Sequence, residues 1–448
     1  MTSTLLQWLL VILSSFALLW WVPRARTEAE FYEGRQQDRQ PGFWLLLASL
    51  VISWLFAKSL TNAANLGLSY GLVGGLAYGT YYLSFAVAGY VIYRLRTQGG
   101  FNSIHEFLVT KHGQSAVGLF SLLIGFRLFN EVWSNTMVIG SYFGAEGSGP
   151  YLLAVVVFTV LTLAYALKGG MASSILTDLV QMALFAVLLV VFLGMIGLDD
   201  AAWSSSQPAS SPWGTFSFAG GVDLLLVALV QSLSYPFHDP VMTDRGFISD
   251  VHTTRRAFYW ALPVGAACIV LFSLVGVFAK AGGLEGQAAV EVAKLLGVPA
   301  MLVINLIMIT SAASTLDSTF ASWSGLVTRF GPSRTLTTGR IAMGVLAILG
   351  TIPVFLGPEI LSATTISGLM VVGLAPVFLL WRMDVPAWSF HAAVGIGLFV
   401  GLHYAIIGVP SWLMFGDGKY AGLLGATVLG TALAFVFFTG SRVFSARA

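Results

Sequence analysis

Five ionisable residues stand inside long apolar segments of the chain: Lys58, Arg127, Glu131, Asp178 and Asp317. A charged side chain near the centre of a bilayer costs at least about 2.5–3.5 kcal/mol unless it is paired or hydrated. Such residues therefore line a pathway for a solute or an ion, or they hold helices together. The chemistry they offer is the binding of a charged or polar partner, and a purely structural ion pair is the alternative for each.

A face of hydroxyl groups lies close to Asp317. Ser311, Ser314, Thr315 and Ser318 follow the spacing i, i+3, i+4, i+7, which places them on one side of a helix. Neutral oxygen ligands beside a carboxylate suit a small hard cation. Close packing of small residues between membrane helices produces the same pattern. The pattern alone therefore leaves an ion site and a packing face both open.

Two apolar segments are interrupted by residues that disfavour a continuous membrane helix. Segment 43–66 becomes polar at Lys58, and segment 220–240 contains Pro236 and Pro240. Each proline removes a backbone donor and clashes with the preceding turn, so this segment is expected to bend or unwind. Interrupted helices at corresponding positions of two halves indicate a transporter built as an inverted repeat. Unwound backbone inside a membrane is tolerated where it lines a cavity, and there it can bind an ion or a solute.

The composition identifies the environment of the chain. Of the 448 residues, 57% are hydrophobic and only 9% are charged, compared with about 25% charged residues in an ordinary soluble domain. Intrinsic disorder, a nucleic-acid-binding domain and a secreted disulfide scaffold are excluded. The single cysteine, Cys268, cannot form a disulfide within the chain. The sequence therefore predicts an all-α polytopic membrane protein, with the lipid bilayer and not nucleic acid as its partner.

Hydropathy predicts thirteen transmembrane helices. A span needs about 20 apolar residues, and the segments that meet this rule are 4–22, 43–66, 71–95, 115–143, 150–168, 171–197, 220–240, 256–281, 296–329, 338–357, 358–382, 389–409 and 421–441. Because each half holds five helices, the second half is expected to insert upside down, as a five-plus-five inverted repeat. The predicted parts are an extra N-terminal helix and cytoplasmic loop (1–42), the first repeat (43–197), an extracellular loop (198–219), the second repeat (220–382) and two C-terminal helices (383–448).

Basic residues are divided unequally between the two sets of alternate loops, which predicts the orientation. One set holds Arg24, Arg26, Arg35, Arg39, Arg94, Arg96, Lys111, Lys168, Arg245, Arg255, Arg256, Arg329, Arg334, Arg340, Arg382, Arg442 and Arg447. The other set holds Lys280, Lys294 and Lys419. The N-terminus is therefore expected outside and the C-terminus in the cytoplasm, and the expected location is the bacterial inner (plasma) membrane.

Four stretches resemble motifs of the sodium/solute symporter family, and their order and spacing agree over about residues 43–382. They are Gly169-Gly-Met-Ala-Ser-Ser-Ile-Leu-Thr177-Asp178-Leu-Val-Gln181, Ser311-Ala-Ala-Ser314-Thr315-Leu-Asp317-Ser318, Asp244-Arg245-Gly-Phe-Ile-Ser-Asp and Gly99-Gly-Phe-Asn-Ser-Ile-His-Glu-Phe-Leu. The resemblance implies the fold of the bacterial leucine transporter (LeuT fold) and sodium-coupled symport of a small polar organic solute by alternating access. It also implies Na+ as the coupling ion, no organic cofactor, and transport by a single copy, with the oligomeric state left open.

The resemblance further implies where cations bind. The expected sodium ligands are the carbonyls of Ile52, Leu55 and Ser311 and the hydroxyls of Ser314 and Thr315. Five neutral oxygens would hold a sodium ion weakly enough to release it. Some members hold a second sodium near an aspartate of the fifth core helix, and the corresponding residues here are Asp178, Asp317 and Ser318. Asp317 replaces a serine of some members, so this second site is expected to hold a cation, a proton or a salt bridge.

Lys58 is the sharpest departure from the family pattern. It lies in the break of the first core helix, where some sugar transporters of the family have an acidic residue, and Ser59 takes the place of a substrate-binding glutamine. Because a buried ammonium must be compensated, three interpretations remain. Lys58 binds a carboxylate of the substrate, pairs with Asp317 or Asp178, or acts as a tethered cation that weakens sodium dependence.

Further substrate contacts are expected around the two helix breaks. Tyr235 aligns with a tyrosine that gates the substrate in sugar-type members, although a packing role is the alternative. Arg127 and Glu131 lie four residues apart, so they either neutralise each other or line the central cavity. The full set of candidate substrate-binding residues is Lys58, Ser59, Asn62, Tyr235, Arg127 and Glu131, and Asn65 and Asn135 would add polar groups to the same pocket.

Other classes of function fit the sequence less well. An enzyme would need a nucleophile beside a base or a cluster of metal ligands, and neither pattern occurs. A channel would need repeated pore-lining rings. The alternatives that remain are a proton-coupled or sodium-independent transporter of the same fold, or a transporter-like membrane sensor. The substrate stays open among amino acids, monocarboxylates, urea, sugars and other small solutes.

Overall fold

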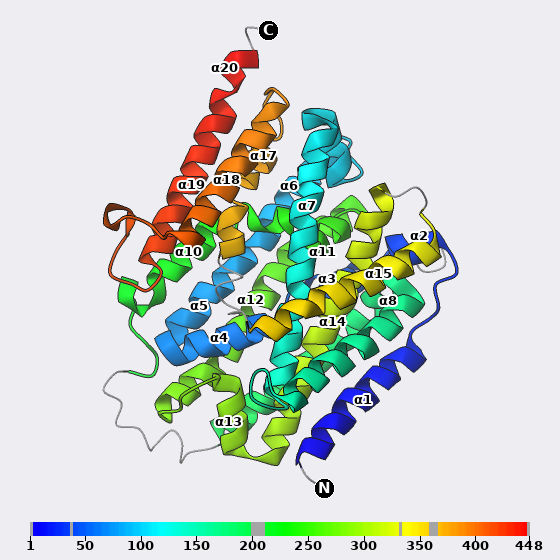
Figure 1. Cartoon of the computed structure of the whole chain (residues 1–448), viewed down its shortest axis with the longest axis vertical. Helices are drawn as coiled ribbons and strands as arrows, with labels where there is room; N and C mark the ends of the chain where they lie inside the picture. The colour runs from blue at the N-terminus through cyan, green and yellow to red at the C-terminus, as the bar shows by residue number, and fades with distance from the viewer. Residues whose placement is uncertain (1–2, 36–38, 199–210, 331–333, 358–365, 446–448) are drawn as a thin grey trace.

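The computed structural model describes residues 3–35, 39–198, 211–330, 334–357 and 366–445 (Figure 1). Its regular elements are helices, as the sequence predicts. In chain order they are α1 (Ser3–Trp21), α2 (Glu28–Glu33), α3 (Phe43–Ile52), α4 (Ala57–Tyr70), α5 (Leu72–Gly79), η1 (Thr80–Tyr82), α6 (Leu83–Gln98), α7 (Ile104–Ser141), α8 (Gly149–Gly197), η2 (Phe218–Val222), α10 (Asp223–Gln231), η3 (Tyr235–His238), α11 (Pro240–Arg245), α12 (Val251–Ala281), α13 (Ala288–Leu296), α14 (Val298–Phe330), α15 (Leu336–Thr351), η4 (Ile352–Leu356), α17 (Leu374–Leu379), α18 (Trp388–Ile406), η5 (Ser411–Leu413), α19 (Ala421–Gly440) and α20 (Arg442–Ser445).

Among the described residues, eight helices are long and apolar enough to cross a membrane, or nine if the bent pair α3–α4 is one span. The expected number was thirteen, and the difference has local causes. Helix α8 covers two expected segments, because its 49 residues include a break at Gly170, whose φ of 58° and ψ of −142° suit glycine. Segments 71–95 and 220–240 are divided into shorter helices. Segment 358–382 lies partly outside the described residues.

Both predicted helix interruptions are present. Helices α3 and α4 are bent by 58° at a break of four residues. In the second half, α10 ends at Gln231, a 3₁₀ turn follows over Tyr235–His238, and α11 begins at Pro240. Each break leaves backbone groups without the helical pattern of hydrogen bonds, and both breaks contribute residues to the interior of the bundle.

Helices α4 and α12 pack with their backbones in direct contact. A Cβ atom on Gly276 of α12 would fall on the backbone of Ala64 and Leu68, and one on Gly67 of α4 would fall on the carbonyl of Ser273. Glycine at these two positions therefore lets the helix axes approach more closely than any other residue would. The two helices form one tightly joined unit beside the first helix break.

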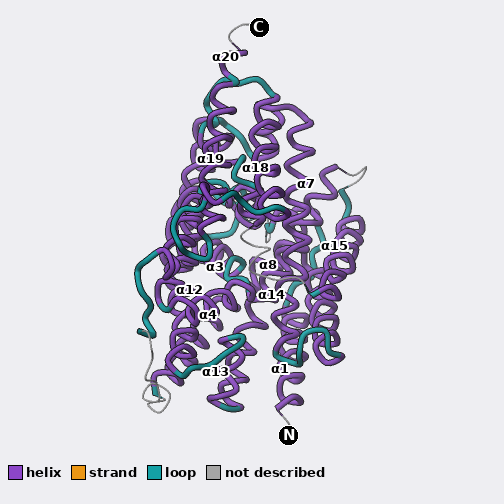
Figure 2. Tube along the Cα trace, turned by 60° about the vertical axis from the view of Figure 1, so that its left-hand side comes forward, coloured by secondary structure: helices purple, strands orange, loops and turns teal. Residues whose placement is uncertain are grey.

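The two ends of the chain lie at opposite ends of the molecule (Figure 1). Helix α13 lies at the end where α1 begins, whereas α18 and α19 pack side by side toward the end that carries α20 (Figures 1 and 2). This arrangement agrees with the predicted alternation of loops, in which Lys294 of α13 and Arg442 of α20 face opposite sides of the membrane. Which side is cytoplasmic remains a prediction.

Candidate functional site

A buried cluster of charges joins the first helix break to α7. The Lys58 Nζ lies 2.8 Å from Glu131 Oε2 and donates a hydrogen bond of 3.1 Å to Ser134 Oγ. Glu131 also forms an ion pair with Arg127, one turn earlier on α7. Asn135 Nδ2 donates to Glu131 Oε2 over 2.9 Å. Glu131 is therefore held by two cations and an amide, and each of these groups compensates part of its burial.

Asp239 completes the cluster from the second helix break. Its Oδ2 lies 3.2 Å from Arg127 Nη2 and accepts a hydrogen bond of 2.9 Å from Trp54 Nε1. Its Oδ1 caps α11 by accepting from the backbone N–H of Val241 over 3.0 Å. The cluster thus contains two basic and two acidic side chains, all buried. The charges balance without a solute.

The partner of Lys58 differs from both protein partners that the sequence suggested. The expected protein partners were Asp317 and Asp178, whereas the ammonium pairs with Glu131. Lys58 lies in the first turn of α4, beyond the break, where it faces α7. Asp178 lies on α8 and contacts Ser49 of α3, on the other side of the break, whereas Asp317 lies on α14 and contacts Ser174 and Thr177 of α8. The predicted pair of Arg127 with Glu131 is confirmed.

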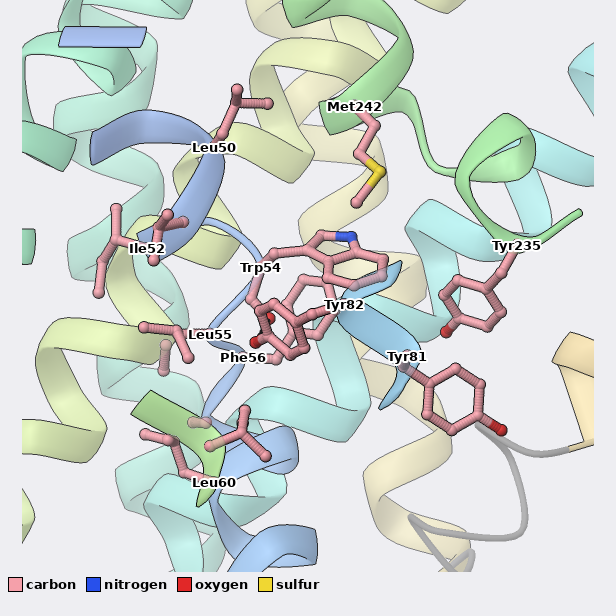
Figure 3. Packing of buried hydrophobic residues seen from close by; sticks show 14 of the residues in the cluster. Leu50, Ile52, Trp54, Leu55, Phe56, Leu60, Tyr81, Tyr82, Tyr235 and Met242 are labelled. Carbon is pink, nitrogen blue, oxygen red and sulfur yellow. Dashed lines mark hydrogen bonds between the residues drawn. The ribbon is translucent and has the colours of Figure 1, made fainter. Parts of the chain in front are cut away.

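Aromatic side chains from both breaks and from η1 lie near one another (Figure 3), and a small cavity lies among them. Trp54 lies with its ring centroid 5.9 Å from that of Tyr235, and Tyr81 lies 5.6 Å from Tyr235. The cavity has a volume of about 20 Å³ and is lined by Trp54, Phe56, Ser59, Tyr78, Tyr81, Tyr82 and Tyr235. This volume is close to that needed for a single water molecule. The rings therefore close over the space between the two breaks.

Of the polar residues expected in the substrate pocket, Ser59 and Asn62 contact Tyr78 beside this cavity, whereas Asn65 does not. Ser59 Oγ lies 3.1 Å from the hydroxyl of Tyr78, and Asn62 Nδ2 donates to the same hydroxyl over 3.4 Å. Asn65, by contrast, accepts a hydrogen bond of 3.0 Å from the backbone N–H of Ala288 at the start of α13. Asn65 therefore joins α4 to α13 and does not belong to the central pocket, which corrects the expectation from the sequence.

The residues predicted to bind sodium come together between the first break and α14. Ser311 Oγ donates to the carbonyl of Leu55, and Thr315 Oγ1 donates to the carbonyl of Ser311 over 3.0 Å. Ser314 Oγ donates to Asp178 Oδ1. Ile52 is the last residue of α3 and is fully buried. Oxygen atoms from both elements thus line one small region, as a cation site there would require.

The residues predicted for a second cation or proton lie next to this region. Ser174 Oγ donates to Asp317 Oδ1 over 2.7 Å, and Thr177 Oγ1 donates to Asp317 Oδ2 over 3.2 Å. Ser318 Oγ lies 2.9 Å from Ser174 Oγ. In the part of the chain that the structure describes, no basic side chain lies within ion-pair distance of Asp317. Asp317 is therefore held by neutral hydroxyl groups.

Arg245 is the main residue that the sequence analysis missed. Its Nη2 lies 3.2 Å from Asp178 Oδ2 and donates to Ser318 Oγ over 2.8 Å, and its Nε donates to Ser49 Oγ over 2.5 Å. Both Arg245 and Asp178 are 0% exposed. Counting basic loop residues had assigned Arg245 to a cytoplasmic loop. The available signal was the charge of Asp178, a carboxylate inside a span that needs a positive partner.

A cavity of about 280 Å³ reaches α11 from the side of α2. Its walls include Tyr32, Thr243, Asp244, Ser322 and Arg329. Thr243 and Asp244 thus border the cavity, whereas the next residue, Arg245, contacts the buried hydroxyl groups. One short helix separates the cavity from the candidate cation sites.

Comparison with known proteins identifies this architecture. The sequence matches no family model and no curated protein. A Na+-coupled sialic acid symporter in a substrate-bound outward-open state matches with a TM-score of 0.71, 14% identity and 98% coverage of both chains. The chain has the leucine-transporter-type fold. The predicted fold class is confirmed.

Two further transporters support this assignment of the leucine-transporter-type fold. Mhp1, a nucleobase-cation-symport-1 family transporter, was captured closed with bromovinylhydantoin bound, and it matches with a TM-score of 0.53, 13% identity and 95% coverage of both chains. MhsT in complex with L-phenylalanine matches with a TM-score of 0.54 and 13% identity, covering 89% of this chain and 98% of its own. These proteins are transporters rather than enzymes. At identities of 13–14%, these comparisons identify the leucine-transporter-type fold. They do not identify the solute or the coupling ion of this chain.

Proposed function

We propose that this protein is a sodium-coupled symporter of a small polar organic solute. The observation that carries the proposal is the meeting of the broken α3 with the hydroxyl face of α14. Ser311 contacts the carbonyl of Leu55 there, and Ser314 and Thr315 lie on the same face. Such neutral oxygens, with the carboxylate of Asp178 beside them, suit sodium. Transport would proceed by alternating access, with a single copy of the chain sufficient.

The solute would bind between the two helix breaks and carry no net charge. The adjacent cluster is balanced, because Lys58 and Arg127 are paired with Glu131 and Asp239. A carboxylate solute would have to displace one of these buried pairs, which is costly. Uncharged hydrogen-bonding groups of a solute can instead replace the hydrogen bonds that the Tyr78 hydroxyl forms with Ser59 and Asn62. The surrounding aromatic rings favour a compact solute with an apolar or planar face.

The proposal is tested with purified protein in detergent and in proteoliposomes. Thermal unfolding is measured in NaCl and in choline chloride with uncharged amides, ureas and sugars, with zwitterionic amino acids, and with monocarboxylates. We expect sodium to raise the melting temperature and to increase the effect of one uncharged solute, followed by sodium-driven uptake of that solute. Stabilisation and uptake that are equal in sodium and choline would reject sodium coupling.

A proton-coupled transporter is the second candidate, and Asp317 is the observation that favours it. Its carboxyl group is buried, and its partners are hydroxyl groups such as Ser174 and Thr177. Because these partners are neutral, the carboxyl group would bind and release a proton without breaking an ion pair, as carboxyl groups of proton pathways in membrane proteins do. Uptake driven by a pH gradient in sodium-free medium, and abolished by Asp317→Asn, would support this candidate over the first.

A further inference from the structure

We propose that Arg245 is a built-in cation that occupies the second cation site, so that transport is coupled to one sodium ion and not two. The predicted coupling to one sodium ion rests on the proposed sodium-coupled function. Its structural part, the identity of the cation held by Asp178, stands on the contacts of Arg245 alone.

The guanidinium group occupies the position that a second metal ion would need. Arg245 Nη2 lies within 3.2 Å of Asp178 Oδ2, 2.8 Å of Ser318 Oγ and 3.3 Å of Ser53 Oγ. These oxygens include two of the three groups that the sequence analysis assigned to a second cation, Asp178 and Ser318. A sodium ion cannot share their lone pairs with the guanidinium, because like charges a few ångströms apart repel strongly away from water.

One carboxylate connects the built-in cation with the proposed sodium ion. Asp178 Oδ2 faces Arg245, whereas its Oδ1 accepts a hydrogen bond from Ser314, a proposed sodium ligand. Ser53 lies between them, 3.5 Å from Ser314 Oγ and in contact with Asp178. A change in the position of Arg245 therefore alters the field at the sodium site through groups already in contact.

The position of Arg245 on the short helix α11 would allow the guanidinium to move away from Asp178. Thr243 and Asp244, its neighbours on the same short helix, border the cavity of about 280 Å³. The Nη1 of Arg245 is buried and has no hydrogen-bond partner among the described residues. The guanidinium is thus incompletely satisfied where it lies, and a shift of α11 toward the cavity would withdraw it from Asp178.

The test compares the thermal stability of Arg245→Gln in sodium, lithium and choline salts. Removing the guanidinium leaves Asp178 buried without a cation, so the variant should melt well below the wild type in choline. Sodium or lithium should bind at the vacated position and restore most of the loss. The sodium titration should steepen, from a Hill coefficient of about 1 in the wild type to a value above 1 in the variant.

Two further variants separate a cation site from a purely structural ion pair. Arg245→Lys keeps the positive charge and should retain the wild-type response to sodium. The double variant Asp178→Asn, Arg245→Gln removes both charges and should be stable in choline, with no steepening. If Arg245→Gln melts equally low in sodium and choline while the double variant is stable, Arg245 is only a counter-ion and the proposal is wrong.

The stoichiometry of the wild type provides an independent measurement. Reversal potentials in proteoliposomes should give one sodium ion for each solute, and two sodium ions would overturn the proposal even if Arg245→Gln cannot be purified. The proposed function and this inference fail differently. A wild type whose melting temperature and uptake do not respond to sodium would reject the proposed function. Sodium rescue of the stability of Arg245→Gln would still support the built-in cation.

Discussion

Lys58 Nζ lies 2.8 Å from Glu131 Oε2, and this pair joins the first turn after the break in α3–α4 to the middle of α7. The two side chains are 1% and 4% exposed. An ammonium and a carboxylate buried to this degree depend on each other, since either one alone would be an uncompensated charge. The pair therefore determines how Lys58 responds to substitution.

We expect Lys58→Met to destabilise the protein by about 3 kcal/mol, within the range for breaking a buried pair. The loss arises because Glu131 keeps only Arg127 as a basic partner, while Met fills most of the space of the lysine. The change is measured as the melting temperature of the purified variant.

The double variant Lys58→Met, Glu131→Gln is the control for this interpretation. It leaves the balanced pair of Arg127 and Asp239, so it should recover much of the lost stability. A Lys58→Met protein that keeps its stability but no longer binds the solute would instead assign Lys58 to the substrate.

Replacing Ser314 and Thr315 together by Ala should abolish sodium-dependent uptake. The change removes two of five proposed oxygen ligands, and a poorly coordinated sodium ion binds weakly. Alanine suits a helix and keeps the face small, so the protein should still fold. Uptake is measured against sodium concentration, with Thr310→Ala on the same helix as the control, because among the described residues its hydroxyl donates to the carbonyl of Leu306, within its own helix. An unaltered sodium dependence in the double variant would remove these hydroxyl groups from the sodium site.

Tyr235→Phe should weaken solute binding by about 5- to 10-fold, the effect of one hydrogen bond worth roughly 1 kcal/mol. The ring contacts with Trp54 and Tyr81 are retained, so stability should change little. Tyr151→Phe is the matched control, since Tyr151 is equally buried but packs in a separate cluster with Trp133. Binding is followed by the solute-induced thermal shift. Equal affinity of Tyr235→Phe and the wild type would leave this hydroxyl without a role in binding.

Single cysteines at Arg35 and Lys294 should be labelled from opposite sides of the membrane. Both side chains are exposed, and the predicted orientation places Arg35 in the cytoplasm and Lys294 outside. The native Cys268 is buried and is changed to Ser to give a cysteine-free background. Membrane-impermeant maleimide is applied to intact and opened cells. If both positions react in intact cells, the predicted topology is wrong.

Most of the fold could be predicted because its signals are local. Apolar runs predict spans, and Pro236 and Pro240 predict the second break by removing donors from the helix. The boundaries were less accurate inside some apolar runs. Segments 71–95 and 220–240 were each expected as one helix and are divided into shorter ones, whereas the break at Gly170 falls where the boundary between segments 150–168 and 171–197 was expected.

Many residues of the candidate site were expected from the sequence, although Asp239 and Arg245 were not, and most of the pairings between distant helices were not expected either. Spacing on one helix is enough to join Arg127 to Glu131, and the hydroxyl face of α14 follows from the same periodicity. The partners of Lys58 and Asp178 depend on how distant helices are placed, which one sequence does not contain. Arg245 was missed for a related reason, because a long side chain at the end of a short helix can reach the interior from a position that hydropathy assigns to a loop.

The glycine contacts of α4 with α12 have a consequence for measuring the motion of the protein. Because Gly67 and Gly276 bring the two backbones together, neither helix can slide past the other without a clash. A tilt of α4 during transport must then carry α12 with it. Spin labels on these two helices would report a constant separation in every state of the cycle. That constant separation is a reference distance for measuring the displacement of α11.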